Sequence, residues 1–322
     1  MSIRIIRQGL LATICDGGRR GYRCLGIGPG GALDGLAFQV ANFLCGNEGH
    51  EPVMELHFPA PEMVFEKDTW VSVAGADFGA LLNEEKIPSW SRFFAAKGMV
   101  LRFANPILGA RAYLAVCGGW QSDKWLGSAG THLKLGVGGF RGRALEKDDQ
   151  VDFPERDSPA FQIRTAFSLD YPEYLGMYYE AAEVIRCIRG PEYEELLSKS
   201  KMDLEEQTFT ITARSDRMGL HLDGNELRTI SRSEMISSAV DFGTIQLLPD
   251  GHCVVLMADH QTTGGYSRIA SVIKADLPKL AQARPGEAIR FKILSLSEAE
   301  ASLLEMEKRL VLIRSICRQP NS

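Results

Sequence analysis

Residues 99–116 read MVLRFANPILGARAYLAV, a pattern typical of β-structure. The two apolar runs, Met99–Phe103 and Ala112–Val116, are rich in residues that favour strands, and each has the length of a short strand. Between them, Asn105–Ala110 supplies Asn, Pro and Gly, which are turn-forming residues. The sequence therefore predicts two strands joined by a hairpin connection.

Similar short runs recur on both sides of this stretch. Glycine makes up 32 of the 322 residues, and many of these glycines stand in clusters between apolar runs. Such spacing is typical of many short strands and tight turns, so we expect a mainly β protein with a few short helices. The further predicted strands are Val53–Phe58, Met63–Phe65, Thr69–Val73, Gly79–Leu82, Val184–Arg189, Thr208–Ala213, Thr244–Leu248, Val254–Met257, Ile269–Ile273 and Ile289–Leu294.

Two helices are predicted from capping residues and apolar spacing. Asp34 is a good N-cap for a helix over Gly35–Cys45, and Gly46 can end that helix. Near the end of the chain, Ser297 and Glu300 have the spacing of a capping box. The apolar stripe behind this box has two interpretations: it docks on the protein's own second lobe, or it contacts another subunit.

The chain is long for a single hydrophobic core, so two lobes are expected. A polar, weakly periodic stretch separates the two strand-rich halves and is interpreted as the connection between them. The predicted domains are an N-terminal β-rich lobe (1–153), a connection (154–183), a C-terminal lobe (184–296) and a C-terminal helix (297–322).

The composition argues against several classes of function. The formal net charge is −5 and Lys and Arg form no stripe, so a nucleic-acid-binding surface is not expected. The seven cysteines are scattered and form no C-x-x-C pair, which favours a reducing compartment. Because the sequence has neither a signal peptide nor an apolar run of about 18 residues, the expected location is the cytoplasm.

Nucleotide and metal motifs are absent or out of context. Gly26–Gly31 matches the letters G-x-G-x-x-G, but no apolar strand runs into it and Pro29 lies inside it, so a dinucleotide site is not predicted. Two interpretations stay open for this stretch: a plain turn, or a glycine backbone that approaches a ligand or another chain beside an anion-favouring helix N-terminus. The chain has no P-loop, and its histidines lack metal-ligand spacing, so no metal site is expected.

The strongest local signal is the loop that follows the predicted strand Val254–Met257. Its residues are Asp259, His260, Gln261, Thr262, Thr263, Gly264, Gly265 and Tyr266. A purely structural hairpin would need only the glycines, so the excess of polar groups predicts a binding loop held on a rigid sheet. His260 is the histidine suited to acid–base chemistry, and the alternative is a solvated loop residue.

Polar side chains at two other places are suited to ligand binding. Arg217 follows a predicted strand and suits a carboxylate or phosphate, and the alternative is an internal Arg–Asp pair that pins a turn. Ser128 and Thr131 lie in the glycine-rich stretch 127–142 without an obvious base beside them. They are expected to donate hydrogen bonds to a ligand and not to act as nucleophiles.

A series of motifs along the chain resembles a known family, the biotin-dependent carboxyltransferase or KipA-like proteins. The resemblance runs from about residue 3 to residue 300. The motifs that carry it include Asp16-Gly17-Gly18-Arg19, Gly30-Gly31-Ala32-Leu33-Asp34, Leu126-Gly127-Ser128, Arg189-Gly190-Pro191-Glu192, Ser215-Asp216-Arg217-Met218-Gly219 and Gln261-Thr262-Thr263-Gly264-Gly265-Tyr266.

The resemblance implies two cyclophilin-like β-barrel lobes and a multi-subunit enzyme. The family includes the C subunit of ATP-hydrolysing bacterial 5-oxoprolinase. This subunit works with two partners, which are the A subunit and the KipI-like B subunit. Together these convert 5-oxo-L-proline, ATP and water into L-glutamate, ADP and phosphate. ATP is therefore expected at the level of the complex, and the chain is expected to be inactive alone. No Met-Lys-Met biotin attachment sequence occurs in this chain.

Within this resemblance the candidate residues receive roles as hypotheses. Asp259 or His260 would handle a proton, Arg217 would hold a carboxylate or phosphate, and Glu192 would orient a neighbour. The other residues expected at a shared substrate site are Gln261, Thr262, Thr263, Gly264, Gly265, Tyr266, Ser128 and Thr131. Two alternatives stay open: a regulator that binds a KipI-like kinase inhibitor, and a carboxyltransferase subunit that acts on a urea-like amide.

Overall fold

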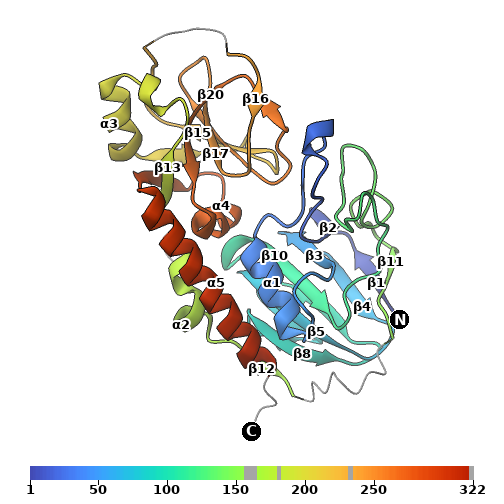
Figure 1. Cartoon of the computed structure of the whole chain (residues 1–322). Coiled ribbons are helices and arrows are strands. Elements are labelled where there is room, and N and C mark those ends of the chain that lie inside the picture. Colours follow the sequence, from blue (N-terminus) through green and yellow to red (C-terminus); the bar gives the residue numbers. More distant parts are fainter. Residues whose placement is uncertain (156–164, 180–182, 231–234, 319–322) are drawn as a thin grey trace. The chain divides into compact units, whose positions relative to one another are not determined.

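The computed structural model describes residues 1–155, 165–179, 183–230 and 235–318, which form two compact units. The first unit contains Met1–Arg19, Asp34–Gly176 and the chain from Arg309 onward. The second contains Arg20–Leu33 and Met177–Lys308. Arg20–Leu33 thus belongs to the second unit, although the sequence places it in the N-terminal lobe. Figure 1 shows the course of the chain through both units.

The first unit is built from two antiparallel six-stranded sheets. In spatial order, one sheet contains β11 (Gln150–Asp152), β1 (Ser2–Arg7), β4 (Glu62–Phe65), β9 (Val100–Phe103), β6 (Ala80–Leu82) and β7 (Glu85–Lys86). The other contains β12 (Phe167–Ser168), β8 (Ser91–Ala95), β5 (Thr69–Asp77), β10 (Leu108–Val116), β3 (Val53–His57) and β2 (Leu11–Cys15).

The two strands predicted within residues 99–116 are confirmed as β9 and β10, but the predicted hairpin between them is wrong. β9 pairs with β4 and β6, whereas β10 pairs with β3 and β5 in the other sheet. The connection returns along an earlier turn, where Ala104 N donates to Gly79 O (3.1 Å) and Ile107 N donates to Asp77 O (2.8 Å). The chain therefore crosses from one sheet to the other at this point.

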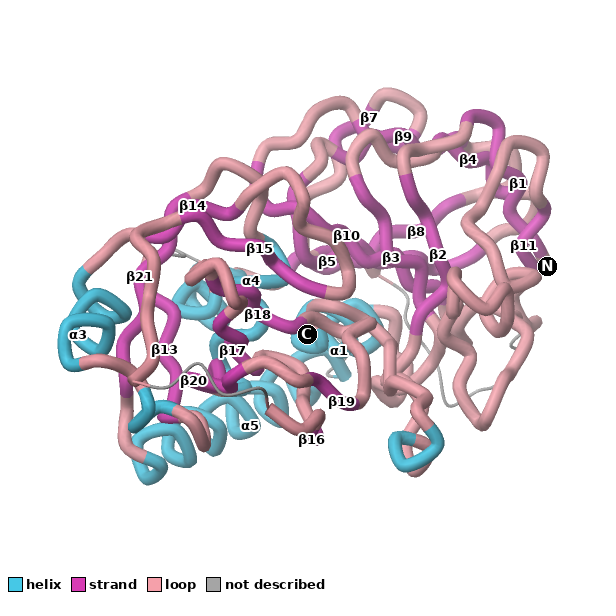
Figure 2. Tube along the Cα trace, turned by 90° about the horizontal axis from the view of Figure 1, so that it is seen from above, coloured by secondary structure: helices cyan, strands magenta, loops and turns pink. Residues whose placement is uncertain are grey.

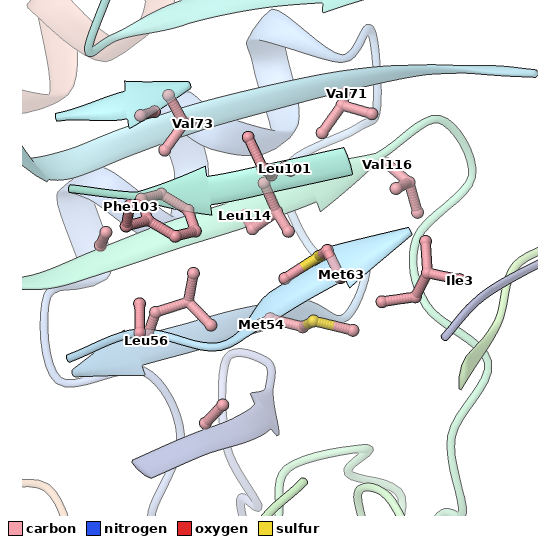
Figure 3. Close-up of a cluster of buried hydrophobic side chains, with 14 of the residues drawn as sticks. Ile3, Met54, Leu56, Met63, Val71, Val73, Leu101, Phe103, Leu114 and Val116 are labelled. Carbon is pink, nitrogen blue, oxygen red and sulfur yellow. The ribbon is translucent and has the colours of Figure 1, made fainter. Parts of the chain in front are cut away.

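The apolar faces of the two sheets share one core, which explains the crossing. Figure 3 shows Leu101 of β9 and Leu114 of β10 in the same buried cluster, although their strands belong to different sheets. Alternation along β5 sends Val71 and Val73 into this core and Ser72 to the opposite face. Strands with one buried apolar face are stable only when a second layer covers that face.

α1 (Gly35–Leu44) covers the opposite face of the second sheet, against β5 and β10 (Figure 1). The helix begins as predicted, because the Asp34 carboxylate accepts hydrogen bonds from Leu36 N (3.1 Å) and Ala37 N (2.9 Å). The predicted helix over Gly35–Cys45 is confirmed to within one residue at its end. Asp34 itself occupies the anion-favouring position at the helix N-terminus.

The second unit contains a closed barrel of seven strands, and the expected mainly β fold is confirmed. Around the barrel the strands are β13 (Val184–Arg189), β20 (Ser267–Val272), β17 (Thr244–Leu247), β18 (Cys253–Leu256), β15 (Gly219–Asp223), β14 (Phe209–Ile211) and β21 (Ala288–Ile293). A separate two-stranded ribbon consists of β16 (Ser238–Ala239) and β19 (Thr263–Gly264), which lie side by side in Figure 2.

The remaining described elements are helical. The shorter ones are α2 (Tyr171–Leu175), α3 (Ser198–Glu206), α4 (Leu277–Gln282) and the 3₁₀ turns Arg23–Leu25, Gly176–Tyr178, Tyr193–Glu195 and Lys274–Asp276. The last helix is α5 (Leu296–Arg318). No helix among the described residues is both long enough and apolar enough to cross a membrane.

The capping box of α5 lies two residues before the predicted one. Ser295 Oγ accepts from Glu298 N (3.3 Å), and Glu298 Oε2 accepts from Ser295 N (2.8 Å). The predicted apolar stripe is half-buried at Leu303 and buried at Met306, Leu310, Ile313 and Cys317. Its last turns belong to the first unit, where Arg92 Nη1 donates to Cys317 O (2.9 Å). The expectation that the whole stripe docks on the second lobe is therefore corrected for this end of the helix.

Candidate functional site

The loop Asp259–Tyr266 leaves the barrel at β18 and returns to it through β19 and β20. Its first turn is fixed by the neighbouring strand connection, because Asp259 N donates to Arg217 O (2.9 Å). Its second half is fixed by the ribbon with β16, and Val240 N donates to Thr262 O (3.2 Å). The backbone of the loop is thus held at both ends by rigid elements, as a binding loop requires.

Arg217 joins two segments of the second unit that are far apart in sequence. Its Nε donates to Asp259 Oδ2 (2.8 Å), and its Nη2 donates to Asp259 Oδ1 (3.2 Å) and Gly31 O (2.7 Å). The pair is sheltered, since the Arg217 and Asp259 side chains are 14% and 33% exposed. The carboxylate that Arg217 holds in this structure is therefore the one on Asp259, and its role toward substrate stays a prediction.

His260 is buried within the loop, with a side chain that is 0% exposed. Its Nδ1 lies 2.5 Å from Gln261 O, and because a carbonyl oxygen only accepts, the hydrogen in this contact belongs to Nδ1. Nε2 then carries the lone pair in the neutral ring, and it has no hydrogen-bond partner among the described residues. Burial lowers the pKa of His260, which favours this neutral form near pH 7.

Asp241 and Arg23 surround the buried imidazole with charge. Asp241 Oδ1 lies 3.9 Å from His260 Nε2, and Asp241 Oδ2 lies 3.2 Å from Arg23 Nη1. Arg23 also donates through Nη2 to Val240 O. The negative charge of Asp241 opposes the effect of burial on the pKa of His260, whereas the positive charge of Arg23 adds to it. Neither residue was predicted as part of the site.

The glycine-rich segment Arg20–Leu33 runs along this loop in the second unit. A Cβ at Gly28 would lie 2.9 Å from His260 O, so the close approach there favours glycine. Together with the Gly31 carbonyl on Arg217, this contact shows that the glycines let the backbone approach the protein's own loop. The backbone approaches the protein's own loop here, which decides neither of the interpretations left open for the segment, and a ligand role stays a prediction.

The other loop residues combine exposed hydroxyls with a buried amide contact. Thr263 and Tyr266 are exposed, Thr262 is buried, and Gly264 and Gly265 are half-buried. Gln261 Nε2 donates to Gln246 Oε1 (3.3 Å), although Gln246 was not predicted as a site residue. The loop thus presents three exposed residues, Gln261, Thr263 and Tyr266, next to two glycines, and the Gln261 amide contacts the side chain of Gln246 in β17.

Ser128 and Thr131 lie in the first unit, where both hydroxyls have partners. Ser128 Oγ donates to Asp16 Oδ1 (2.7 Å), and the other carboxylate oxygen, Asp16 Oδ2, accepts from Ala129 N (2.6 Å). Thr131 Oγ1 donates to Ile14 O (2.8 Å). These bonds tie the glycine-rich loop to the end of β2, and the predicted contribution of the two hydroxyls to a shared substrate site stays a prediction.

Glu192 holds Arg268, and its predicted role at a substrate site stays a prediction. Its carboxylate accepts from Arg268 N (2.8 Å), Nε (3.0 Å) and Nη2 (2.6 Å). Burial alone would raise the pKa of Glu192, but the hydrogen bonds from Arg268 outweigh it and leave this pKa below its ordinary value. Arg268 Nη1 donates in turn to Ala239 O (2.9 Å), so Glu192 acts on the ribbon that contains Thr263.

Replacing Glu192 with glutamine will lower the free energy of unfolding by about 1–3 kcal/mol at neutral pH, because a buried charged acceptor of Arg268 is lost. The midpoint of thermal unfolding will fall with it. The extra stability of the wild type over this variant is present above the ordinary pKa of the carboxyl group. It disappears as the pH falls through the lowered pKa of Glu192. Thermal unfolding followed from pH 7 to pH 3 measures this. The matched control is Glu194→Gln, at an exposed ion pair two residues away, which should leave the midpoint unchanged.

Two of the three missed residues, Gln246 and Asp241, differ in how visible they are in the sequence. Gln246 is a polar residue inside the apolar run Thr244–Leu248, and such a position in a predicted strand is a usable signal. Asp241 belongs to no motif and approaches His260 only through the tertiary fold. Among the described residues, no group of three or more His, Cys, Asp or Glu side chains could hold a metal ion.

The chain resembles known proteins over nearly its whole length. The family model for the carboxyltransferase domain, subdomain A and B, matches residues 25–293. The chain is 35% identical over 297 residues to the 5-oxoprolinase C subunit of Escherichia coli (strain K12), which covers 92% of this chain and 93% of that protein. It is 36% identical over 310 residues to the 5-oxoprolinase C subunit of Haemophilus influenzae, covering 96% of this chain and 97% of that protein.

A solved structure, the K. lactis urea amidolyase, shares the fold. It matches with a TM-score of 0.87 at 24% identity, over 97% of this chain but only 20% of the longer protein. At this identity the similarity concerns the architecture alone, since one fold hosts different activities.

Proposed function

Because this chain belongs to the family of carboxyltransferase domains with subdomains A and B, we propose that it is the C subunit of an ATP-dependent 5-oxoprolinase. The observation that carries the proposal is the end-to-end match with two proteins named as 5-oxoprolinase C subunits, which covers 93% and 97% of their lengths. The match to urea amidolyase covers 20% of that protein. The proposed partners are the A subunit and the KipI-like B subunit. The proposed location is the cytoplasm.

The reaction needs both activation and charge stabilisation. A lactam is a poor electrophile because its nitrogen lone pair is delocalised into the carbonyl group. In the proposed reaction, the lactam oxygen takes the γ-phosphoryl group of ATP and ADP leaves. Water then adds to the ring carbon, and the C–N bond breaks as its nitrogen takes up a proton, which gives an acyl phosphate. A second water hydrolyses this acyl phosphate to L-glutamate and phosphate. Fixed hydrogen-bond donors around the reacting oxygen would stabilise the charge that develops on it.

The loop Asp259–Tyr266 supplies the groups that this chemistry uses. His260 offers a neutral imidazole with a lone pair on Nε2, which is the form that accepts a proton from water. The exposed Thr263 hydroxyl and the backbone amides of Gly264 and Gly265 are the proposed donors to substrate. Arg217 and Asp259 hold the loop in place. ATP is assigned to the complex, since this chain contains no P-loop sequence.

The test is reconstitution with the two proposed partners. This chain is produced alone and together with the A and B subunits, and ATP-dependent release of L-glutamate from 5-oxo-L-proline is measured for each combination. We expect turnover only when all three proteins are present, since the chain is proposed to be inactive alone.

The same reconstitution separates the alternatives. A stable complex that releases no glutamate would reject the proposal. Carboxylation of a urea-like amide with a biotinylated partner would favour a carboxyltransferase subunit. Binding to a KipI-like protein without turnover of either substrate would favour a regulator.

A further inference from the structure

Gln246 lies on the outer face of the barrel in the second unit. In β17 the alternating residues Ile245 and Leu247 point into the barrel core, so Gln246 points to the other side. Its cross-strand neighbours are Arg268 of β20 and Val254 of β18, and Val254 belongs to a small apolar cluster. Gln246 is nevertheless only 2% exposed, because the loop that contains Gln261 and Gly264 packs over it.

One end of the Gln246 amide has a partner and the other does not. Oε1 accepts from Gln261 Nε2 (3.3 Å), whereas the buried Nε2 has no hydrogen-bond partner among the described residues. Nε2 faces the backbone of Gly264, where a Cβ would lie only 2.5 Å away, so a side chain at that position would collide with the amide. A buried donor without an acceptor destabilises a fold, and an apolar side chain of this shape would avoid that cost beside Val254.

A second buried nitrogen on the same loop is also without a partner. His260 Nε2 is covered and makes no hydrogen bond among the described residues, while Nδ1 of the same ring is engaged by Gln261 O. The ring that carries the buried acceptor His260 Nε2 contacts the start of the segment Gln261–Gly264, and the buried donor Gln246 Nε2 faces its end. Native folds satisfy nearly all buried polar groups, and exceptions of this kind are expected at functional sites.

We propose that Gln246 is a substrate-binding residue whose side-chain amide donates to an acceptor oxygen of the substrate. Without substrate, Gly264 covers the amide, and this residue has no side chain to hinder displacement. When substrate binds, its oxygen replaces the Gly264 backbone as the neighbour of Nε2. The inference rests on the proposed function, because 5-oxo-L-proline carries two such acceptors, the lactam carbonyl and the carboxylate.

The test is Gln246→Met in the reconstituted three-subunit complex. Methionine keeps the approximate length of the side chain and removes the unsatisfied donor. We expect KM for 5-oxo-L-proline to rise about tenfold to a hundredfold, while the midpoint of thermal unfolding stays unchanged or rises. Gln246→Glu keeps the acceptor for Gln261 and replaces the donor by a second acceptor, so its KM should rise further, through repulsion of the substrate oxygen.

Gln207→Met is the matched control because its amide is fully paired. Gln207 Oε1 accepts from Asn225 N (2.6 Å) and Gln207 Nε2 donates to Asn225 O (3.3 Å). This variant should lower the unfolding midpoint and leave KM unchanged, the opposite signature. If Gln246→Met behaves like the control, Gln246 is structural and the inference is overturned. If the wild-type complex releases no glutamate, the proposed function fails, and the inference falls with it.

Inhibition by substrate fragments shows which oxygen Gln246 holds. L-Proline keeps the carboxylate and lacks the lactam carbonyl, whereas pyrrolidin-2-one keeps the carbonyl and lacks the carboxylate. The fragment that retains the contacted oxygen should bind about tenfold more weakly to the Gln246→Met complex than to wild type. The other fragment should bind both complexes equally. Equal binding of both fragments to both complexes would overturn the inference.

Discussion

Replacing Arg217 with alanine will lower kcat/KM of the reconstituted complex for 5-oxo-L-proline by about 100-fold or more, which corresponds to roughly 2.7 kcal/mol. The guanidinium holds the Asp259 carboxylate through two hydrogen bonds and the Gly31 carbonyl through a third. Its removal leaves a sheltered carboxylate without its bidentate partner and releases the start of the loop from Arg20–Leu33. Breaking an ion pair by removing one member costs about 3–5 kcal/mol when the pair is fully buried.

Three variants define how Arg217 acts. Arg217→Lys keeps the charge but not the planar fork, so its activity should lie between those of wild type and the alanine variant. Asp259→Ala should reproduce most of the loss if Arg217 works through that carboxylate, and the double variant should then be little worse than either single one. Arg214→Ala, at an exposed arginine three positions earlier, is the control and should retain activity. Full activity in Arg217→Ala would contradict the assigned role.

Short apolar runs predicted these strands but could not predict the partners of each strand. Met99–Phe103 and Ala112–Val116 are strands, as predicted, yet they lie in different sheets. Alternation says which face of a strand is buried, and both strands bury their apolar faces in one core. A hairpin within one sheet and a crossing between two facing sheets both bury the apolar faces of the strands. Which of the two forms therefore depends on strand pairing along the whole sheet.

At the start of α5, the sequence spacing could not decide which of two overlapping capping boxes begins the helix. Ser295 with Glu298 and Ser297 with Glu300 both have the spacing of a capping box. The structure uses the earlier box, in which Ser295 and Glu298 exchange hydrogen bonds. Once a helix is nucleated, each added residue contributes another hydrogen bond, so the longer helix is favoured. The spacing alone does not distinguish the two boxes.

The candidate site was predictable where its residues are consecutive and hidden where the fold brings them together. The polar loop stands out because its polar residues follow one another along the chain. Arg217 was named from its own motif, whereas Asp241 and Gln246 approach that loop only through the barrel and its connections. The segment Arg20–Leu33 belongs to the second unit, although the residues on both sides of it in the sequence belong to the first unit. No local sequence pattern predicts this.

The pH profile of the reconstituted complex tests His260 as the proton acceptor. Burial lowers its pKa from the ordinary 6.5, and only the neutral ring accepts a proton. We expect the pH profile of kcat/KM to have an acid limb, in which activity rises with pH around a midpoint below pH 6.5. At neutral pH the profile should be flat. The unfolded chain binds the proton more tightly, so the contribution of His260 to stability is present above about pH 6.5 and is lost as the pH falls through the lowered pKa.

Replacing His260 with asparagine will remove this limb and lower kcat by about 100-fold to 10,000-fold, the range typical of a lost general base. Asp241→Asn removes the nearby charge that raises the pKa of His260, so the limb should move to lower pH while the base is retained. His252→Asn, at a partly exposed histidine beside β18, should leave the profile unchanged. An asparagine variant that stays within tenfold of wild type and keeps the acid limb would show that the proton is taken by another group. Asp259 would then be the residue to test, because its carboxylate is the other proton acceptor assigned to this loop.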